Sequence, residues 1–187
     1  MEVTVMASVK SIRWAKAAVL LAAGAVFIVA ISFNGFTRAG KVEAAGNRKE
    51  LPDFRLSDLS GTTWHLSDER GKVVLLNFWA TWCDACQFET PALVQVSKTF
   101  SGRGLRIVGI DMDQDESKSQ VPAFVHRYGI PYRILMNDYS FDLVNHLEAL
   151  PTSVLLDRQG RIVKSWVGAV DEKDLAPYLN QLLSEKA

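Results

Sequence analysis

Cysteine is scarce in this sequence: only Cys83 and Cys86 occur among 187 residues, together with three histidines. There is no second cysteine pair and the histidines lack close spacing, so a structural zinc site with four ligands is disfavoured. Gln87, not histidine, follows Cys86, which excludes a motif for covalent haem attachment. Ala80 stands where a peroxiredoxin would need threonine, three residues before Cys83, and no earlier cysteine exists to carry a lipid.

The sequence also lacks an excess of charge of either sign. Lys and Arg number 21, Asp and Glu number 21, and the formal net charge is zero with neutral histidines. The sequence has no excess of positive charge that would attract nucleic acid. It also has no long run of acidic residues that would indicate a disordered tail. We therefore expect no nucleic-acid partner, and the length suits one domain with a full hydrophobic core.

Charge is absent from one long apolar stretch near the N-terminus. Its length, 21 residues, is close to the about 20 that a helix needs to cross the hydrocarbon core of a membrane. Basic residues at positions 10, 13 and 16 precede it, which favours a cytoplasmic N-terminus and an outward-facing domain. The expected organisation is a cytoplasmic segment at 1–16, a transmembrane signal-anchor at 17–37, a linker at 38–50 and a folded domain at 51–187.

This organisation predicts a protein that crosses the cytoplasmic membrane once and faces the periplasm or the cell exterior with its folded domain. A cleaved signal peptide is the alternative, because residues 42–46 offer small side chains of the kind that signal peptidases accept. The apolar stretch is longer than the usual about 7–15 residues of a signal peptide, which favours the uncleaved anchor.

From residue 51 onward, apolar patterns typical of strands alternate with patterns typical of helices, which predicts an α/β fold. The alternation around Ser60 and Gly61 indicates an N-terminal β-hairpin, and the turn at 158–160 indicates a second hairpin, so the central sheet should be mixed. Strands are expected at 73–79, 105–111, 132–136, 153–157 and 161–167, and helices after Cys86 and at 120–128, 141–147 and 172–183.

The two cysteines lie where the apolar strand at 73–79 gives way to a helix. The helix is indicated by apolar residues at helical spacing, namely Phe88, Ala92, Leu93, Val96 and Phe100. Cys83 should stand at the helix N-terminus, where free backbone N–H groups and the helix dipole favour a thiolate. Cys86 is three residues on, within reach of Cys83, so the pair can close a disulfide and reopen it.

This spacing favours thiol-disulfide exchange, in which Cys83 attacks a target disulfide and Cys86 resolves the mixed disulfide. A purely structural disulfide is disfavoured because so short a loop constrains the unfolded chain little. Two other functions remain open: a disulfide oxidase or isomerase, which predicts a much lower pKa for Cys83, and a non-enzymatic metal-binding module that uses the cysteine pair as ligands.

Two stretches of the sequence together resemble a known family, "LLNFWATWCDACQFETPAL" at residues 75–93 and "LPTSVLLDRQGRIVKSWVG" at residues 150–168. With Trp82, both cysteines, Pro91 and Pro151 in place, they resemble the membrane-anchored thioredoxin-like proteins of the TlpA/ResA type. The resemblance implies a thioredoxin-like fold with helices on both faces of the mixed sheet. One departure is Ala85, because most relatives carry proline immediately before the second cysteine.

The resemblance also implies a function and a set of partners. It implies a reducing thiol-disulfide oxidoreductase outside the cytoplasmic membrane, often with a part in cytochrome c maturation. The expected substrates are disulfide-containing exported proteins, with apocytochrome c as the specific candidate, and the expected source of electrons is a membrane thiol donor. No cofactor is expected beyond the redox-active disulfide between Cys83 and Cys86.

The site residues implied by the resemblance are Cys83, Cys86 and Glu89 for catalysis and Trp82, Leu150 and Pro151 for substrate binding. Pro151 is implied to be cis and to lie beside the cysteines, and Leu150 to offer backbone groups to an incoming peptide. Glu89 matches a glutamate of ResA-like proteins; if partly buried, it could take the proton from Cys86. The alternative for Glu89 is a solvated carboxylate on the helix surface.

Overall fold

The computed structural model describes residues 42–185. The cytoplasmic segment and the signal-anchor expected at 1–16 and 17–37 lie outside the described residues. Within the described part of the chain, no helix has the length and apolar composition of a membrane span.

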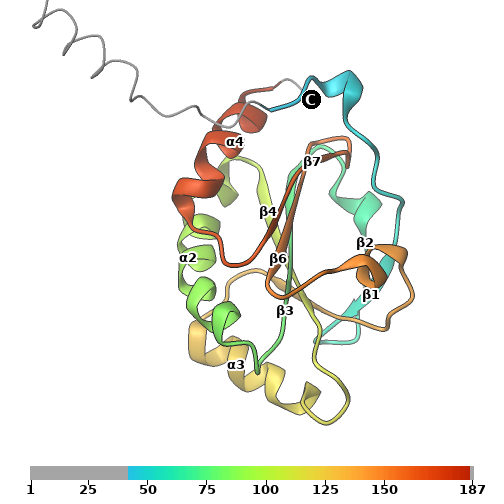
Figure 1. Ribbon diagram of the computed structural model, residues 1–187, viewed down its shortest axis with the longest axis vertical. Helices are drawn as coiled ribbons and strands as arrows, with labels where there is room; N and C mark the ends of the chain where they lie inside the picture. Colours follow the sequence, from blue (N-terminus) through green and yellow to red (C-terminus); the bar gives the residue numbers. More distant parts are fainter. Residues whose placement is uncertain (1–41, 186–187) are drawn as a thin grey trace, which may run out of the picture. The chain divides into compact units, whose positions relative to one another are not determined.

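A mixed sheet of seven strands forms the centre of the domain, as the sequence predicts (Figure 1). The strand order is β2-β1-β5-β4-β3-β6-β7; the neighbours β3, β4 and β5 run parallel, and every other neighbouring pair is antiparallel. The strands are β1 (Arg55–Asp58), β2 (Thr63–His65), β3 (Val73–Trp79), β4 (Leu105–Asp111), β5 (Arg133–Met136), β6 (Thr152–Leu156) and β7 (Ile162–Val167).

Residues 42–185 also form three α-helices and five short 3-10 helices, which lie between the strands or, for η1 and α4, outside them. The α-helices are α2 (Asp84–Phe100), α3 (Val121–Tyr128) and α4 (Glu172–Ser184), and the 3-10 helices are η1 (Ala45–Asn47), η2 (Leu66–Glu69), η3 (Ser101–Arg103), η4 (Lys118–Gln120) and η5 (Asp142–His146). The helix predicted at 141–147 is therefore the short 3-10 helix η5, in which Val144 is buried in the core and Leu143 packs against it.

Strand β3 is buried on both faces and divides the core in two. Every one of its side chains is buried, and they point alternately to opposite faces of the sheet. Val74, Leu76 and Phe78 join the core on one face, whereas Val73 and Leu75 join the core on the other. The continuous apolar run in the sequence is thus that of a strand covered on both sides.

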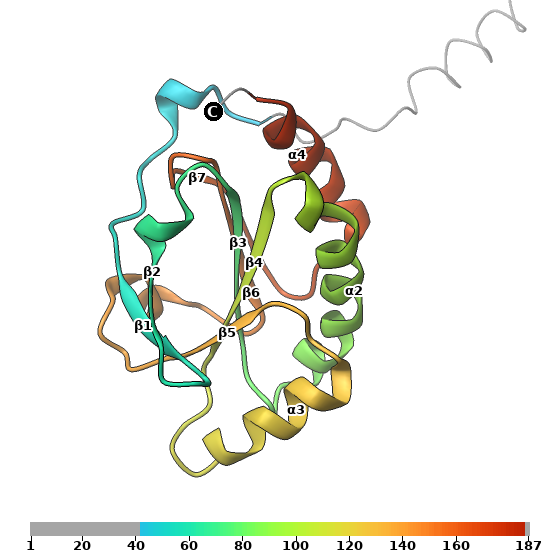
Figure 2. The same ribbon diagram turned by 180° about the vertical axis from the view of Figure 1, so that it is seen from behind.

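Helices lie on both faces of the sheet, as expected, but the α-helices among residues 42–185 all lie on one face and only 3-10 helices lie on the other. Leu93 of α2 and Leu175 of α4 pack with Leu75, and Phe124 of α3 packs with Trp79, so all three α-helices cover the same face of the sheet. Figures 1 and 2 show α2, α3 and α4 along one side of the domain, and β1 and β2, which lie at one edge of the sheet, on the opposite side of the domain. The sheet is covered on both faces, but one cover contains no α-helix.

The opposite face is covered by the N-terminal hairpin and two 3-10 helices. Phe54 and Trp64 from the hairpin region, Leu66 of η2 and Val144 of η5 pack there with Phe78. These short elements cover the apolar side chains on that face of the sheet, so no α-helix is required to bury them.

The segment predicted as a linker, 38–50, packs against the domain from Val42 onward. Val42 is a buried member of the core under α4, and Glu50 forms an isolated β-bridge with Arg161. The side chain of Arg48 is 1% exposed and pairs with Asp157. Residues 42–50 thus contact the folded domain, which their small and charged side chains without an apolar period did not indicate.

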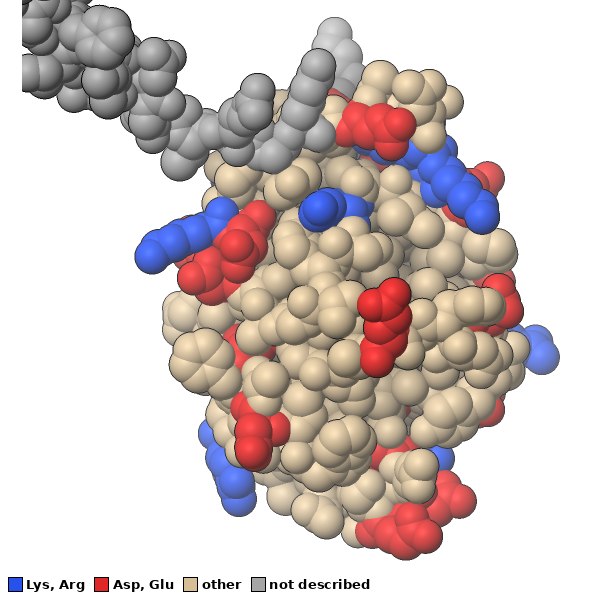
Figure 3. All heavy atoms as spheres, viewed as in Figure 1, with Lys and Arg blue, Asp and Glu red and all other residues tan. Residues whose placement is uncertain are grey.

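Charged side chains of both signs are interspersed on the face seen in Figure 3, with uncharged residues between them. This distribution agrees with the equal numbers of acidic and basic residues in the sequence.

Candidate active site

The two cysteines form a disulfide at the N-terminus of α2, with 5.2 Å between their Cα atoms. Strand β3 ends at Trp79, and the N–H of Cys83 donates to the carbonyl of Ala80 at 3.2 Å, a turn that leads from strand to helix. Cys83 is the N-cap of α2, and its Sγ accepts a hydrogen bond of 3.2 Å from the N–H of Cys86. The structure thus places the pair where backbone N–H groups stabilise negative charge on Cys83 sulfur.

The two sulfur-bearing side chains differ in accessibility. The exposed fraction is 7% for Cys83 and 1% for Cys86. Both cysteines are therefore buried in the disulfide form, and Cys83 is the more accessible of the two. The larger exposed fraction of Cys83 agrees with Cys83 as the attacking thiol. Cys83 is nevertheless less exposed than its position at a helix N-terminus would suggest.

Two large aromatic side chains near the cysteines face solvent. Trp82 is 62% exposed and Phe88 is 83% exposed. The apolar period of the sequence placed Phe88 on the buried face of α2, and the structure contradicts this, because Glu89 takes the buried position instead. Helical spacing of apolar residues alone does not distinguish a buried phenylalanine from an exposed one at a binding surface.

Leu150 and Pro151, which the resemblance implies as substrate-binding residues, directly precede β6. The Leu150–Pro151 peptide bond is cis. Leu150 packs against the apolar cluster that contains Cys83 and Cys86. The carbonyl of Pro151 accepts from the N–H of Gly168 at 2.8 Å, whereas no backbone hydrogen bond of Leu150 is formed within residues 42–185. The backbone of Leu150 is thus free to pair with another chain.

Glu89 lies in a buried polar network beneath the cysteines rather than on the helix surface. It is 2% exposed, and its Oε1 accepts hydrogen bonds from Asn77 Nδ2 at 3.1 Å and from Ser153 Oγ at 3.5 Å. Asn77 Nδ2 also donates to Ser153 Oγ at 3.1 Å, which links β3, β6 and α2. Glu89 Oε2 is buried and has no hydrogen-bond partner among residues 42–185.

This environment changes the acidity of Glu89. Burial raises the pKa of Glu89 from its ordinary value of 4.5 to about 8, although the hydrogen bonds from Ser153 and Asn77 act in the opposite direction. Cys86 precedes Glu89 by three residues, so the two side chains lie on the same side of α2. The solvated alternative for Glu89 is therefore wrong, and its carboxyl group is able to exchange a proton near neutral pH.

Several residues that hold the site in place were not identified from the sequence. Thr81, in the turn before Cys83, donates two hydrogen bonds to Asp113, and Gln87 of α2 donates to the carbonyl of Thr81 at 3.0 Å. Ser153 belongs to the network of Glu89. The run "DMDQD" at 111–115 could have indicated Asp113, because it places carboxylates at the end of a predicted buried strand.

The part of the chain that the structure describes contains no group of three or more His, Cys, Asp or Glu side chains that could hold a metal ion. Cys83 and Cys86 therefore lack a third ligand of these types within residues 42–185. The chemistry that the site supports directly is the opening and closing of its disulfide.

Comparisons with known proteins agree with this geometry. A profile of the AhpC/TSA family matches residues 48–165. Thioredoxin-like protein YneN of Bacillus subtilis is 32% identical over 84% of this chain and 95% of its own, and thiol-disulfide oxidoreductase ResA of the same organism is 33% identical over 83% and 87%.

A solved structure supports the same assignment. The crystal structure of a secreted thiol-disulfide isomerase from Corynebacterium glutamicum matches with a TM-score of 0.65 and 27% identity, over 80% of this chain and 96% of that one. The thioredoxin-like fold is thereby confirmed, and proteins that contain disulfides are the implied substrates. The chain belongs to the AhpC/TSA family and, within it, to the ResA-like thiol-disulfide oxidoreductases, whose redox pair corresponds here to Cys83 and Cys86.

Proposed function

We propose that this oxidoreductase works as a reductase of disulfides in exported proteins. The thiolate of Cys83 attacks one sulfur of the target disulfide, and the other sulfur leaves as a thiolate. Cys86 then attacks Cys83 in the mixed disulfide, which releases the reduced target and leaves the Cys83–Cys86 disulfide. A membrane thiol donor supplies two electrons and two protons to reopen this disulfide for the next cycle.

The observation that carries this proposal is the position of the disulfide at the N-terminus of α2, beside Leu150 and above buried Glu89. The helix N-terminus stabilises the attacking thiolate of Cys83. Glu89 provides the proton acceptor that Cys86 needs before it can attack the mixed disulfide, since only a thiolate is an effective nucleophile. The attack by Cys83 is thus assisted by the helix N-terminus, and the resolving attack by Cys86 is assisted by Glu89.

The direction of transfer is supported by the charge beside Cys83. Asp84 occupies the first turn of α2, and its carboxylate opposes the stabilisation of a thiolate by the helix N-terminus. A disulfide is strongly oxidising when its reduced form is unusually stable, as in enzymes with very acidic attacking thiols. The neighbouring negative charge therefore favours a reducing role over an oxidising one.

The substrate docks, in this proposal, as an extended peptide that pairs with the free backbone of Leu150. Strand addition of this kind supplies affinity without demanding a particular side-chain sequence. Trp82 and Phe88, which are both largely exposed and close to the cysteines in the sequence, supply apolar contacts. The resemblance to the TlpA/ResA type supports apocytochrome c as the specific substrate, since its haem-binding cysteines must be reduced before haem attaches.

The proposed place of action is the outer side of the cytoplasmic membrane, with residues 17–37 as the anchor. The support is the charge-free apolar stretch with basic residues before it. Disulfides form and persist outside the cytoplasm, so substrates of this chemistry are present there.

A redox titration of the purified protein tests the direction. We expect a reduction potential for the Cys83–Cys86 disulfide near about −270 mV, a value typical of thioredoxins, and far below the about −120 mV of strong disulfide oxidants. The measurement equilibrates the protein with glutathione or dithiothreitol buffers and follows the fraction of free thiols. A potential near the oxidising value would support the oxidase or isomerase alternative. Metal bound stoichiometrically by the reduced protein would instead support the binding module.

Replacing Glu89 by Gln should slow the release of reduced target and leave binding largely intact. Glutamine keeps the shape and the hydrogen bonds of Oε1, but it cannot accept the proton of Cys86. We expect a loss of about 100-fold in the rate of the resolving step, the lower end of the range attributed to general base catalysis. Stopped-flow measurement of mixed-disulfide decay across the pH range measures this rate; a rate equal to wild type at every pH would exclude the role.

The same substitution should change stability in a predictable direction. The pKa of Glu89 is raised to about 8 in the folded state from an ordinary value of 4.5, so the unfolded state loses its proton first as the pH rises. Wild-type stability therefore decreases with pH between these two values. Glu89→Gln removes this decrease, and urea unfolding at several pH values provides the check that the variant is folded.

A further inference from the structure

The turn between β3 and the cysteines is anchored from the end of a neighbouring strand. Thr81 lies two residues before Cys83 and is buried. Its N–H donates to Asp113 Oδ2 at 2.7 Å, and its Oγ1 donates to Asp113 Oδ1 at 2.6 Å. Both oxygens of one carboxylate are thus used to hold one residue of the turn.

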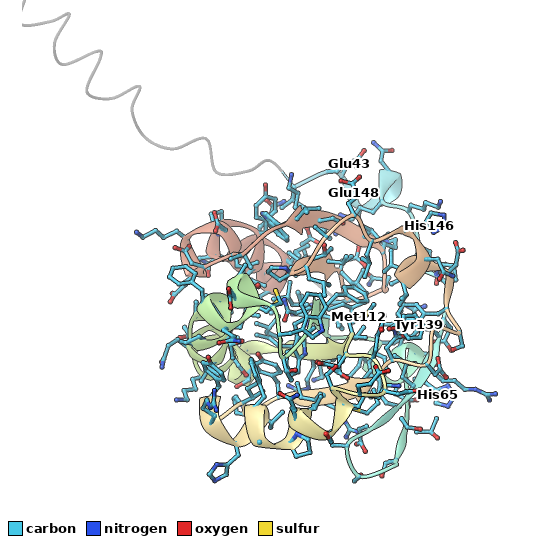
Figure 4. The ribbon with its side chains drawn as sticks, turned by 60° about the horizontal axis from the view of Figure 1, so that its bottom comes forward. Glu43, His65, Met112, Tyr139, His146 and Glu148 are labelled. Carbon is cyan, nitrogen blue, oxygen red and sulfur yellow. A yellow bond between two sulfur atoms is a disulfide. The ribbon has the colours of Figure 1, made fainter. Side chains whose placement is uncertain are left out.

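Asp113 is itself held beside a second buried carboxyl group. Asp111 is the last residue of β4 and the register partner of Trp79, the last residue of β3. The N–H of Asp113 donates to Asp111 Oδ1 at 3.2 Å, while Asp111 Oδ2 is buried without a hydrogen-bond partner among residues 42–185. Both aspartates are 0% exposed. Figure 4 shows Met112, which stands between them in the sequence, near the middle of this end of the molecule.

Two buried carboxyl groups this close do not both ionise readily. Burial, and then the neighbouring carboxylate of Asp113, raise the pKa of Asp111 to about 8. For Asp113 burial acts in the same direction, but interactions with the side chains of Asp111 and Thr81 outweigh it and lower the pKa. At neutral pH the pair therefore carries one proton, which resides on Asp111, and one negative charge, which resides on Asp113.

The charged groups around the pair do not neutralise a second negative charge. Lys118 of η4 is the cation that acts on Asp111, but its Nζ forms an ion pair with the exposed Asp115 at 3.0 Å. Tyr139, from the segment after β5, acts on Lys118. Residues 80–91, the turn before α2 and its first turns, carry Cys83, Asp84, Cys86 and Glu89 as titratable groups and no cation. Ionisation of Asp111 thus adds a repulsive charge beside Asp113.

We propose that Asp113 is a positioning residue for Cys83, that it acts by holding Thr81, and that the proton on Asp111 controls how firmly Thr81 is held. With the turn in place, Cys83 caps α2 and its Sγ accepts the N–H of Cys86. When Asp111 loses its proton, repulsion displaces the carboxylate of Asp113, and the turn loosens. Cys83 then leaves its cap position, and its thiolate loses the stabilisation of the helix N-terminus.

This inference rests on the proposed role of Cys83 as the attacking thiol, and it is independent of the direction of electron transfer. The experiment therefore measures the ionisation of Cys83 rather than turnover. The full chain carries Cys86→Ser, so that Cys83 is the single thiol, and Glu89→Gln, because Glu89 titrates in the same pH range as Asp111. Thiolate absorbance and the rate of alkylation are followed against pH.

Thr81→Val should raise the pKa of Cys83 by about one unit, which means about tenfold less thiolate at neutral pH, since hydrogen bonds to a charged group have energies of this order. Thr81→Ser keeps both donors and should retain the original pKa. Asp113→Asn should also raise the pKa of Cys83, although removal of a nearby negative charge by itself would lower it. A lowered pKa in Asp113→Asn would show that Asp113 acts only as a charge and would overturn the proposal.

Asp111→Asn tests the control by the proton. In the background protein, the thiolate fraction of Cys83 should rise less steeply with pH above about 8 than a single-site titration predicts, and Asp111→Asn, which stays neutral, should restore the single-site titration. The matched control is Glu116→Gln, which changes an exposed carboxylate of the same loop and should leave the profile unchanged. An unchanged profile in Asp111→Asn, or equal thiol pKa values in Thr81→Val and Thr81→Ser, would overturn the inference even where the variants unfold more easily.

Discussion

Replacing Cys86 by serine should convert the enzyme from a catalyst into a trap for its substrates. Cys83 would still attack a target disulfide from the N-terminus of α2, because its helix cap does not depend on the sulfur of Cys86; the bond comes from the backbone N–H of residue 86. The mixed disulfide would then persist, since the hydroxyl of serine cannot displace it. Turnover should fall to the background level while covalent complexes accumulate.

The measurement is non-reducing electrophoresis of the full chain expressed in cells, followed by mass spectrometry of the partners. Cys83→Ser is the matched control and should trap nothing, because Cys86 is 1% exposed and cannot reach a target disulfide. Complexes formed through Cys86 in this control would reverse the assignment of the two thiols. Partners that include c-type apocytochromes would support the cytochrome proposal; only unrelated exported proteins among them would indicate a general reductase.

Replacing Arg48 by methionine should lower the free energy of unfolding by about 3 kcal/mol, within the range found when one partner of a buried ion pair is removed. The Arg48 guanidinium donates to Asp157 Oδ2 at 2.9 Å and to the Glu185 carboxylate at 2.8 and 3.0 Å. Its side chain is 1% exposed and that of Asp157 is 2% exposed. Without Arg48, the buried carboxylate of Asp157 keeps only Arg161 as a cationic partner.

Urea unfolding of the full chain measures this loss. Arg70→Met is the matched control, because Arg70 pairs with Glu50 at 2.8 Å but the two side chains are 37% and 65% exposed. An exposed pair of this kind contributes at most about 1 kcal/mol. Equal effects of the two substitutions would mean that the segment at 42–50 adds no stability to the domain and functions as the linker that the sequence predicts.

The strands at the centre of the sheet could be predicted from the sequence because their signal is local. The stretch at 73–79 is almost wholly apolar and that at 105–111 is rich in β-formers, and strands β3 and β4 have these same bounds. The helix at 141–147 was predicted from an equally local pattern, but it is the 3-10 helix η5. Its residues are held by contacts with the N-terminal segment and the sheet, which no local window contains.

Of the candidate site, the sequence identified the residues that react but not the residues that hold them. Cys83 and Cys86 are recognisable from their spacing and from their position between a strand and a helix. Thr81 and Asp113 are 32 residues apart, and Glu89 and Ser153 are 64 residues apart, so their contacts depend on how the strands are arranged. The exposure of Phe88 and the burial of Glu89 likewise depend on which side of α2 meets the sheet.

By itself the sequence determined the chemistry of this protein, because a cysteine pair at the start of a helix reacts through bonds and dipoles that lie within a few residues of chain. Only the tertiary structure decided the acidity of its carboxyl groups. Glu89 and Asp111 have raised pKa values because distant strands and helices remove water from around them. Desolvation depends on everything that surrounds a group in space, so it cannot be read from the neighbours of that group in the sequence.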